Sequence, residues 1–476
     1  MPKEKHRWEQ VATKLSVDIQ AQFEHTMELS YWYLPHHLRK CLLYLAVFSE
    51  GREIQVSKLT WLWISEGFVK THSERLPEDI ADNYMENLVE RNLVMVSKRS
   101  FDGKIKACHI HDLLLEFCRK KAELENFAQR IKGELRNTEF SSTDHASDIF
   151  KRFSFLKVLD FEFTVIDSLP QGLTFLRYLA FRTVEDTLSL PTDLLNVETL
   201  IVRGVGGRVS LPNTIWKMVK LRHLHIYDQA FFTLNNREEF SETSSTMDDL
   251  QTISSVCFSR VKNADKILEK TPNLRKMRCE VSKFEGSFPA FSKLNKLEML
   301  KISSGEQLTW INDLNIPRNL KKLTLSYFRI DLNEVATLSN LEVLKLLEVT
   351  IRSNVWKVND EQFLRLRILK LENPSFSRWY ASDDAFPCLE RLELKRCQHL
   401  KNIPYCFEHS SSLKSLKIIS CNDMLANSVM HTKESSKYLH GASGFEVSLE
   451  LFGAKPELNE QRNDQTKEIN ILKCIQ

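Results

Sequence analysis

The sequence predicts an α/β protein in which a small, mainly helical domain precedes a long solenoid with a curved parallel sheet. Three observations predict this: a leucine-spaced phrase recurs over the C-terminal two-thirds of the 476 residues, prolines lie at matching places between the phrases, and apolar residues have helical spacing before them. A repeat period of roughly 20–30 residues is typical of solenoids, whose units pack only on their neighbours.

Twelve copies of the phrase L-x-x-L-x-L, in ideal or degenerate form, lie between Leu156 and Ile418. They begin 20 to 29 residues apart, the length of one strand and one return segment in a leucine-rich repeat. The longest step spans the polar run Ser241–Thr246, where we expect an insertion. The copies are LKVLDF at Leu156, LRYLAF at Leu176, VETLIV at Val197, LRHLHI at Leu221, LQTISS at Leu250, LRKMRC at Leu274, LEMLKI at Leu297, LKKLTL at Leu320, LEVLKL at Leu341, LRILKL at Leu366, LERLEL at Leu389 and LKSLKI at Leu413.

Each phrase predicts a strand whose first, fourth and sixth residues point into the solenoid, because a strand alternates its faces. The residues between them are expected to face solvent. Cys397 and Cys421 each lie eight residues after the first leucine of their repeat. Leucine-rich repeats use Asn or Cys at that position to bond the backbone of the turn, so we expect a structural role for both cysteines.

The first 130 residues change from a helical to a β-like pattern. Helical spacing predicts helices over about 8–33, 36–48, 56–66 and 77–91, with Gly67 ending the third and Pro77 beginning the fourth. Two β-like runs, 93–98 and 104–110, flank a turn at Asp102-Gly103, and a last helix begins near His111 or Asp112. This order predicts a winged-helix-like domain.

We therefore expect three regions along the chain. The winged-helix domain should occupy residues 1–135 and the solenoid of about twelve repeats residues 150–432. Residues 433–476 are polar and should form a tail or a cap on the last repeat.

Winged helices often bind DNA through a helix rich in Lys and Arg. The helix expected at 77–91 carries acidic residues instead, which repel phosphates. We therefore expect no nucleic-acid partner and infer that the domain packs against protein. The acidic residues are Glu78, Asp79, Asp82, Glu86 and Glu90.

Composition excludes several other classes. A hydrophobic fraction of 42% and a net charge of +3 are typical of a soluble globular protein. Ten cysteines are scattered without a C-x-x-C pair, so we expect no metal site and no disulfide framework. The N-terminus lacks a signal segment, and the longest apolar run, Cys41–Phe48, is too short to span a bilayer. We expect a cytoplasmic protein without a transmembrane segment; peripheral membrane association is left open.

Two strings carry a family resemblance. LSYWYLPHHLRKCLLYLAVFSEGREIQVSKLTWLWISEGFV, at Leu29–Val69, resembles the segment that leads into the winged-helix subdomain of plant intracellular immune receptors. IHDLLLEFC, at Ile110–Cys118, resembles their Met-His-Asp motif. With the repeats behind them, these strings resemble coiled-coil nucleotide-binding leucine-rich-repeat (NB-LRR) disease resistance proteins, most closely the solanaceous late-blight resistance group. The resemblance covers about residues 1–430.

The resemblance implies a nucleotide-sensing motif made of His111, Asp112 and Ile110. In a full-length family member His111 would contact the β-phosphate of ADP, Asp112 would fix the local geometry, and Ile110 would replace the usual methionine as an apolar plug. Exchange of ADP for ATP would then change how the winged helix packs. The residues alone favour another interpretation of His111, as a helix-start histidine bonded to neighbouring backbone.

The chain contains no phosphate loop of the form G-x-x-x-x-G-K-[ST]. Its only Gly-Lys pair is Gly103-Lys104, and no glycine lies five residues before Gly103. Family members carry this loop upstream of the position of Met1, so the resemblance implies an N-terminally truncated chain. We expect no cofactor for this chain alone, because one histidine cannot replace loop amides, a lysine and a metal ion. No paired carboxylates or nucleophile elbow suggest an enzyme.

Basic residues recur at strand positions that are expected to face solvent. A stacked set of cations suits an acidic protein surface, although each one alone is most simply a solvated charge. Tyr178, Tyr227, Tyr327 and Phe328 could anchor a partner or fill turns. The candidate partner-binding surface comprises Arg275, Lys276, Arg278, Lys321, Lys322, Arg367, Lys370, Arg391 and Lys395.

These observations predict an immune-receptor fragment that acts in plant defence, including the hypersensitive response, through protein contacts of its repeat surface. The expected partners are the nucleotide-binding (NB-ARC) module, in cis or in trans, and a pathogen effector or a host guard protein. The alternative is an F-box-like substrate adaptor of a ubiquitin ligase. Residues 33–48 offer its Leu-Pro and spaced apolar residues, but the hairpin and IHDLLLEFC would then lack a purpose.

The missing phosphate loop gives a direct prediction. We expect that ADP does not raise the melting temperature of the purified chain, because a ligand stabilises a protein only as far as it binds the folded state. Thermal unfolding with and without millimolar ADP measures this. A clear rise in melting temperature with ADP would contradict it.

Overall fold

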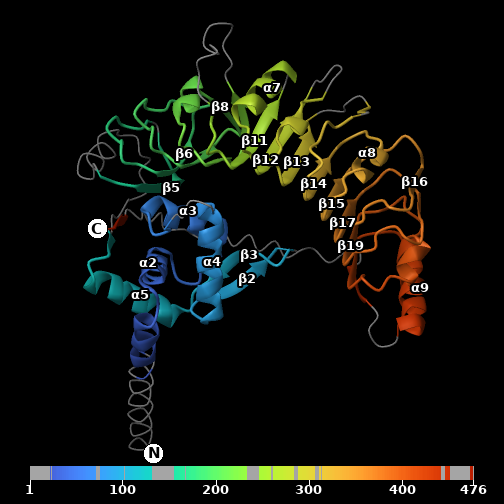
Figure 1. The fold of residues 1–476 in the computed structure, drawn as a ribbon, viewed down its shortest axis with the longest axis horizontal. Helices are drawn as coiled ribbons and strands as arrows, with labels where there is room; N and C mark the ends of the chain where they lie inside the picture. Colours follow the sequence, from blue (N-terminus) through green and yellow to red (C-terminus); the bar gives the residue numbers. More distant parts are fainter. Residues whose placement is uncertain are drawn as a thin grey trace, which may run out of the picture.

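The computed structural model describes residues 22, 24–70, 75–100, 102–130, 155–166, 168–232, 246–258, 261–282, 288–305, 310–311, 313–440, 445–450 and 472–474. Two bodies are visible: an arch of stacked repeats, and a small N-terminal domain that lies within the concave side of the arch (Figure 1). The predicted fold class, a winged-helix domain followed by a leucine-rich-repeat solenoid, is confirmed.

The described part of the winged-helix domain contains the helices predicted at 56–66 and 77–91, the hairpin and the last helix, while the helix predicted at 36–48 changes to a 3-10 turn after Leu43. Most of the helix predicted at about 8–33 lies outside the described residues. Gly67 has φ of 82° and ends α3 in the left-handed conformation, which glycine adopts without strain. One short strand, β1 (Ile54–Gln55), was not predicted; it pairs with β3, giving the antiparallel order β1-β3-β2. The other elements are α2 (His36–Leu43), a 3-10 turn η1 (Tyr44–Val47), α3 (Val56–Glu66), α4 (Pro77–Glu90), β2 (Met95–Arg99), β3 (Ile105–His109), α5 (Asp112–Leu124) and β4 (Ala128–Arg130).

All twelve predicted phrases form strands of one parallel sheet that lines the concave side of the arch (Figure 1). Neighbouring strands pair so that equivalent phrase positions stack, as Leu300, Leu323 and Leu344 do. The strands are β5 (Val158–Val165), β6 (Tyr178–Thr183), β7 (Thr199–Gly204), β9 (His223–Ile226), β11 (Thr252–Phe258), β12 (Lys276–Val281), β13 (Met299–Ser304), β14 (Lys322–Ser326), β15 (Val343–Leu347), β17 (Ile368–Glu372), β19 (Arg391–Lys395) and β20 (Ser415–Ile419).

The return segments carry short strands and helices on the outer side of the arch. Strand β10 pairs with β8 and also with β11 of the large sheet, whereas β16 and β18 form a separate two-stranded sheet, and all of these pairs are parallel. The predicted insertion at Ser241–Thr246 lies outside the described residues, except for Thr246. These elements are β8 (Arg208–Leu211), η2 (Asn213–Lys217), β10 (Gln229–Phe232), α7 (Val261–Lys270), η3 (Phe291–Lys293), α8 (Leu332–Ala336), β16 (Val355–Val358), β18 (Arg378–Ala381) and η4 (Tyr405–Glu408).

The solenoid extends past the predicted end at residue 432. Helix α9 (Asp423–His440) crosses that boundary, and β21 (Glu446–Glu450) adds a further parallel strand beside β20. In its phrase, GFEVSL, Gly444 stands where the first leucine belongs, which hides the repeat from a leucine count. Beyond it, β22 (Leu472–Cys474) pairs antiparallel with β4, so part of the predicted tail returns to the winged-helix domain.

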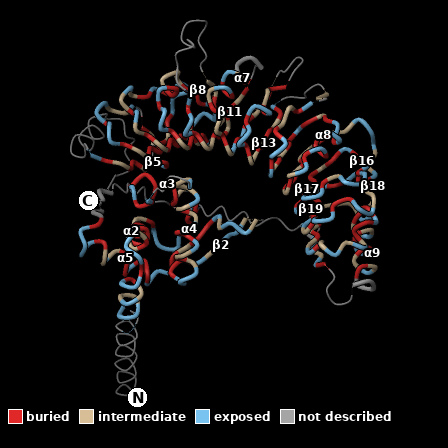
Figure 2. The backbone as a smooth tube through the Cα atoms, viewed as in Figure 1, coloured by how far each residue is buried: buried red, intermediate tan, exposed pale blue. Residues whose placement is uncertain are grey.

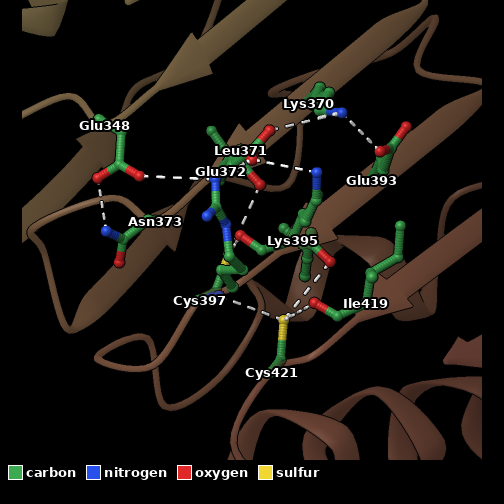
Figure 3. A network of polar contacts seen from close by, with 12 residues as sticks. Glu348, Lys370, Leu371, Glu372, Asn373, Glu393, Lys395, Cys397, Ile419 and Cys421 are labelled. Carbon is green, nitrogen blue, oxygen red and sulfur yellow. Dashed lines mark hydrogen bonds and ion pairs between the residues drawn. The ribbon is translucent and has the colours of Figure 1, made fainter. Parts of the chain in front are cut away.

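The two turn cysteines have the structural role that their spacing predicts (Figure 3). The Cys421 Sγ accepts a hydrogen bond from the backbone N–H of Cys397 at 3.4 Å and donates to the carbonyl oxygen of Leu394 at 3.4 Å. The Cys397 Sγ donates to the carbonyl oxygen of Lys395 at 3.5 Å. The Cys397 thiol therefore bonds the backbone at the end of its own strand, and the Cys421 thiol bonds backbone groups at the end of the preceding repeat's strand.

Burial concentrates inside the arch, between the concave sheet and the return segments (Figure 2). The phrase residues Leu297, Leu300 and Ile302 are fully buried, as the predicted inward positions require. Under the later repeats the core contains aromatic rings. Trp356 and Trp379 stack with ring centroids 5.0 Å apart, and Phe386 meets the Trp379 ring edge to face at 5.9 Å.

This aromatic core allows a stability test. Trp379 is fully buried, so Trp379→Ala should lower the free energy of unfolding by about 3–5 kcal/mol, the usual cost of emptying a large aromatic site. Tyr380→Ala is the matched control, because the adjacent Tyr380 side chain is 49% exposed. Urea unfolding followed by tryptophan fluorescence and circular dichroism compares them; equal midpoints would refute the core assignment.

Candidate functional site

The candidate site is the interface at which the winged-helix domain lies on the concave sheet. Helix α3 lies over the first strands, β5 and β6, and the hairpin β2–β3 extends along the later ones (Figure 1). The interface therefore joins residues that are far apart in the sequence. Helix α3 supplies apolar, ionic and aromatic contacts, and α4 and the hairpin supply further ion pairs.

The apolar part of the interface corrects one expectation from the sequence. Residues at the third and fifth phrase positions were expected to face solvent, yet four of them are buried in the core of the winged-helix domain: Val158, Tyr178, Ala180 and Ile201. All four belong to the first three repeats. The apolar residues at outward positions in these repeats indicated that this end of the sheet is covered. Tyr178, which was considered as an anchor for a partner, packs instead against the winged-helix domain of the same chain.

Lys58 of α3 makes the first ionic contact of the interface. Its Nζ lies 2.8 Å from an Asp160 carboxylate oxygen and 2.6 Å from a Glu162 oxygen, both on β5. Burial by itself lowers the pKa of Lys58, but the two carboxylates outweigh it and raise that pKa. A buried cation between two acids is strongly disfavoured without them, so this contact requires both domains in place.

Glu78, the second residue of α4, makes the most extensive polar contact. Its two carboxylate oxygens accept hydrogen bonds from Arg222 Nε and Nη2, both at 2.8 Å. The ring Nε2 of His223 lies 3.0 Å from the Glu78 Oε1. Burial alone raises the pKa of Glu78, but these hydrogen bonds reverse the effect and hold it far below its usual value. Bidentate pairing with arginine fixes both geometry and charge.

His223 is fully enclosed between the two domains. Its ring stacks on Trp61 of α3, with centroids 4.4 Å apart. Burial lowers its pKa below the ordinary 6.5, against the attraction of Glu78. Its Nδ1 is buried and has no hydrogen-bond partner among the described residues. A neutral ring that donates from Nε2 to Glu78 fits this environment, because a proton on Nδ1 would be a buried donor without an acceptor.

Further along the sheet, acidic residues of the small domain meet basic residues of the repeats. A carboxylate oxygen of Asp79 lies 3.9 Å from Arg275 Nη1, and Asp102, at the tip of the hairpin, forms an ion pair with Lys322. Burial is the largest influence on the pKa of Lys276 and lowers it. The negative charge of Asp82 acts in the opposite direction. The acidic helix that argued against DNA thus binds the basic repeats of the same chain.

The structure does not gather the nine predicted surface residues into one free stripe. Arg275, Lys276 and Lys322 face the winged-helix domain, as described above. Others pair with acids of the repeats themselves: Lys321 with Glu298 at 3.8 Å, Arg367 with Glu390 at 2.5 Å, Lys370 with Glu393 at 2.8 Å and Lys395 with Glu372 at 3.2 Å. Arg278, on β12, and Arg391, on β19, are exposed.

The pairing near the C-terminal repeats forms a connected network (Figure 3). Glu372 forms ion pairs with Lys395 and with Arg396. The Nη2 of Arg396 lies 2.5 Å from the Glu372 Oε1. Burial raises the pKa of Glu372, but these cations outweigh it and lower that pKa. The network lies on β17, β19 and the turns that follow them.

The nucleotide-sensing motif lies at the start of α5. Ile110 is buried, whereas His111 and Asp112 are exposed. The Nδ1 of His111 accepts a hydrogen bond from the backbone N–H of Leu113 at 3.3 Å, so this ring caps the helix. This is the helix-start contact that the residues alone favoured; a contact with ADP stays a prediction.

Sequence reasoning missed the residues that hold the two domains together: Lys58, Trp61, Asp160, Glu162 and His223. Lys58 and Trp61 lie in a helix that was predicted correctly, but helical periodicity does not show what its outer face meets. In the described part of the chain, no cluster of three or more His, Cys, Asp or Glu side chains could hold a metal ion. No described helix is long and apolar enough to cross a membrane.

Comparison with known proteins agrees with this architecture. The family described as "Disease resistance protein Winged helix domain" matches residues 47–118, and the one described as "Leucine-rich repeat region" matches residues 135–442. Among solved structures, the functional domain of InlJ from Listeria monocytogenes has 12% identity and a TM-score of 0.35 over 63% of this chain and 64% of its own.

Two curated relatives come from Solanum demissum. The putative late blight resistance protein homolog R1B-16 is 40% identical over 94% of this chain and 39% of its own length. Late blight resistance protein R1-A is 38% identical over 94% of this chain and 39% of its own. The chain thus spans about two-fifths of the length of these relatives. With their winged-helix and leucine-rich-repeat regions, it belongs to the disease resistance protein family, in the group of the late blight resistance proteins.

Proposed function

We propose that this chain works in a plant immune receptor as a clamp, in which the repeat solenoid holds the winged-helix domain and defence signalling requires its release. The observation that carries the proposal is the contact of Glu78 with Arg222 and His223. It is buried, charged and shared between the domains. Such a contact is stable when both sides are present and costly when one side is removed, so it favours two distinct states.

The distribution of charge supports an interface that can separate. Apart from the apolar contacts of α3, the domains meet through ion pairs between acids of α4 and the hairpin and cations of β9, β12 and β14. Polar interfaces exchange protein contacts for water more readily than apolar cores do. The small domain can therefore leave the sheet without unfolding.

We also propose that ADP acts on this clamp through His111 when an NB-ARC module supplies the phosphate site. Helices α5 and α3 contribute to one hydrophobic core, to which Leu115 and Cys118 of α5 and Leu59 and Trp63 of α3 belong. A change in how α5 is held at His111 would shift α3, which carries Lys58 and Trp61 at the interface. The nucleotide would thereby bias docking only through different contacts in its two states.

The uncovered strands near the C-terminal end are the proposed site for an external partner, a pathogen effector or a host guard protein. The charged network around Glu372 lies there. The alternative F-box function has less support. The apolar residues that suggested it, among them Leu38, Leu42 and Leu45, are buried in the winged-helix core, where they cannot serve an adaptor contact.

Charge reversal tests the clamp. Glu78→Lys should free the winged-helix domain from the sheet, because it places a cation against Arg222; the loss should be about 2–5 kcal/mol, as for one side of a buried pair. Fluorescence energy transfer between dyes on the two domains measures docking. Glu86→Lys is the matched control, with the same charge change at an exposed site on the same helix. Unchanged transfer in Glu78→Lys would refute the clamp.

The clamp should also weaken in acid. His223 has a pKa below 6.5 when docked, so docking is strongest above pH 6.5 and is lost as the pH falls and the freed histidine takes up a proton. The low pKa of Glu78 acts in the same direction at more acidic pH. Energy transfer measured from pH 8 to 5.5 should fall, and His223→Gln should flatten that fall. His431→Gln, at a side chain that is 72% exposed, is the control; an equal slope in all three would contradict the assignment.

A further inference from the structure

The charges of the concave face fall into rows, because equivalent phrase positions stack from strand to strand. In the second-position row, acids and cations of neighbouring repeats pair, as Arg177 does with Glu198, and Arg222 and Arg275 pair with Glu78 and Asp79 of the winged-helix domain. The third-position row meets the acids of the winged-helix domain. The fifth-position row on β12 to β15, in register, is different, and it consists of Arg278, Lys301, Thr324 and Lys345.

This row lacks compensating acids in its middle. Arg278 and Lys301 have neither an ion pair nor a hydrogen bond with any side chain in the part of the chain that the structure describes. They lie on adjacent paired strands, roughly 4.8 Å apart along the sheet. Burial and then the like charge of Arg278 lower the pKa of Lys301. Lys301 thus lies beside a second cation in an environment that disfavours its own charge.

The winged-helix domain adds to the positive charge. Lys106 of β3 is exposed and has no ion-pair partner among the described residues. Burial lowers the pKa of Lys345, and the like charge of Lys106 is the next cause. Since the contact of Asp102 with Lys322 holds the hairpin over β14, the two lysines cannot move apart while the domains are docked. Glu393 acts on Lys345 in the opposite sense, so the hairpin here adds a second cation beside a lysine that already has an acidic neighbour.

We propose that a small phosphate-rich anion binds between the hairpin and strands β12 to β15, where Lys106, Arg278, Lys301 and Lys345 surround it. Phosphate groups suit this set because cations at strand spacing and the hydroxyls of Thr324 and Ser303 supply donors to several oxygens at once. A protein partner needs apolar anchors, and no large apolar side chain on these strands is exposed in the described structure.

This site goes beyond the proposed clamp but rests on its docked state. The anion would contact both domains, so it binds the docked arrangement and not the separated one. By mass action it then stabilises docking in proportion to its concentration. A soluble phosphate-rich compound would thereby hold the clamp closed independently of any nucleotide at His111.

The test uses the full chain and inorganic tripolyphosphate, titrated by isothermal calorimetry at constant ionic strength. The unmodified chain should bind it with one site. Lys301→Glu should weaken binding roughly tenfold or more, since each charge-assisted hydrogen bond contributes about 1.5–3 kcal/mol. Lys106→Glu, on the other domain, should weaken it to a similar extent. Lys401→Glu is the control, with the same charge change on an exposed return segment.

Three results would overturn the site. These are equal affinity in Lys301→Glu and Lys401→Glu, equal affinity of the unmodified chain for sulfate, and tighter binding of a hexaaspartate peptide than of tripolyphosphate, which would point to a protein partner. The energy-transfer pair used for the clamp separates the two proposals. If the domains are docked but tripolyphosphate does not bind, only the anion site fails; if the domains are not docked, the clamp fails.

Discussion

The arrangement of this protein depends on the contact of one carboxylate with an arginine and a histidine at β9 of the concave sheet. Glu78 is held there by Arg222 and His223, while Trp61 covers the histidine. On either side the interface changes character. Toward the first repeats it is apolar around Tyr178, and toward the later repeats it consists of separate ion pairs. Glu78 lies where these two parts join, between the apolar contacts around Tyr178 and the ion pairs of the later repeats.

The repeat architecture makes this division possible. A solenoid gives each strand the same backbone and leaves the outward positions free to vary, so one continuous sheet can carry different surfaces along its length. The first repeats use outward apolar residues to hold the winged-helix domain. The last use charges that satisfy one another, as the network around Glu372 shows. Between them lie Arg278 and Lys301, for which the described residues of the domain and of the sheet supply no acidic partner.

Most of the fold could be predicted from the sequence, because it depends on local patterns. Helix ends at Gly67 and Pro77, twelve strands and two turn cysteines all follow from spacing and from the backbone preferences of single residues. The strand β21 was missed because Gly444 replaces the leucine that begins its phrase. A search for the leucine-spaced phrase does not find a repeat that has glycine at the first position, although Val447 and Leu449 supply the apolar residues of the fourth and sixth positions.

The site was harder, because docking brings together residues that are 100 or more positions apart. The sequence identified both sides of the interface, the acidic helix and the basic strands, but it could not show that they belong to one another. Free cations on a repeat surface and cations covered by another domain have the same spacing. Only the apolar outward residues Val158, Tyr178 and Ile201 distinguished them, and they indicate a covered face at that end of the solenoid alone.

The pairing of β22 with β4 gives the molecule a second link between its distant ends. The polypeptide leaves the winged-helix domain at β4, follows the whole arch, and comes back to the same strand. A closed circuit of this kind restricts how the parts can move. While the short antiparallel pair stays intact, the small domain is joined to both ends of the solenoid and not to one end alone.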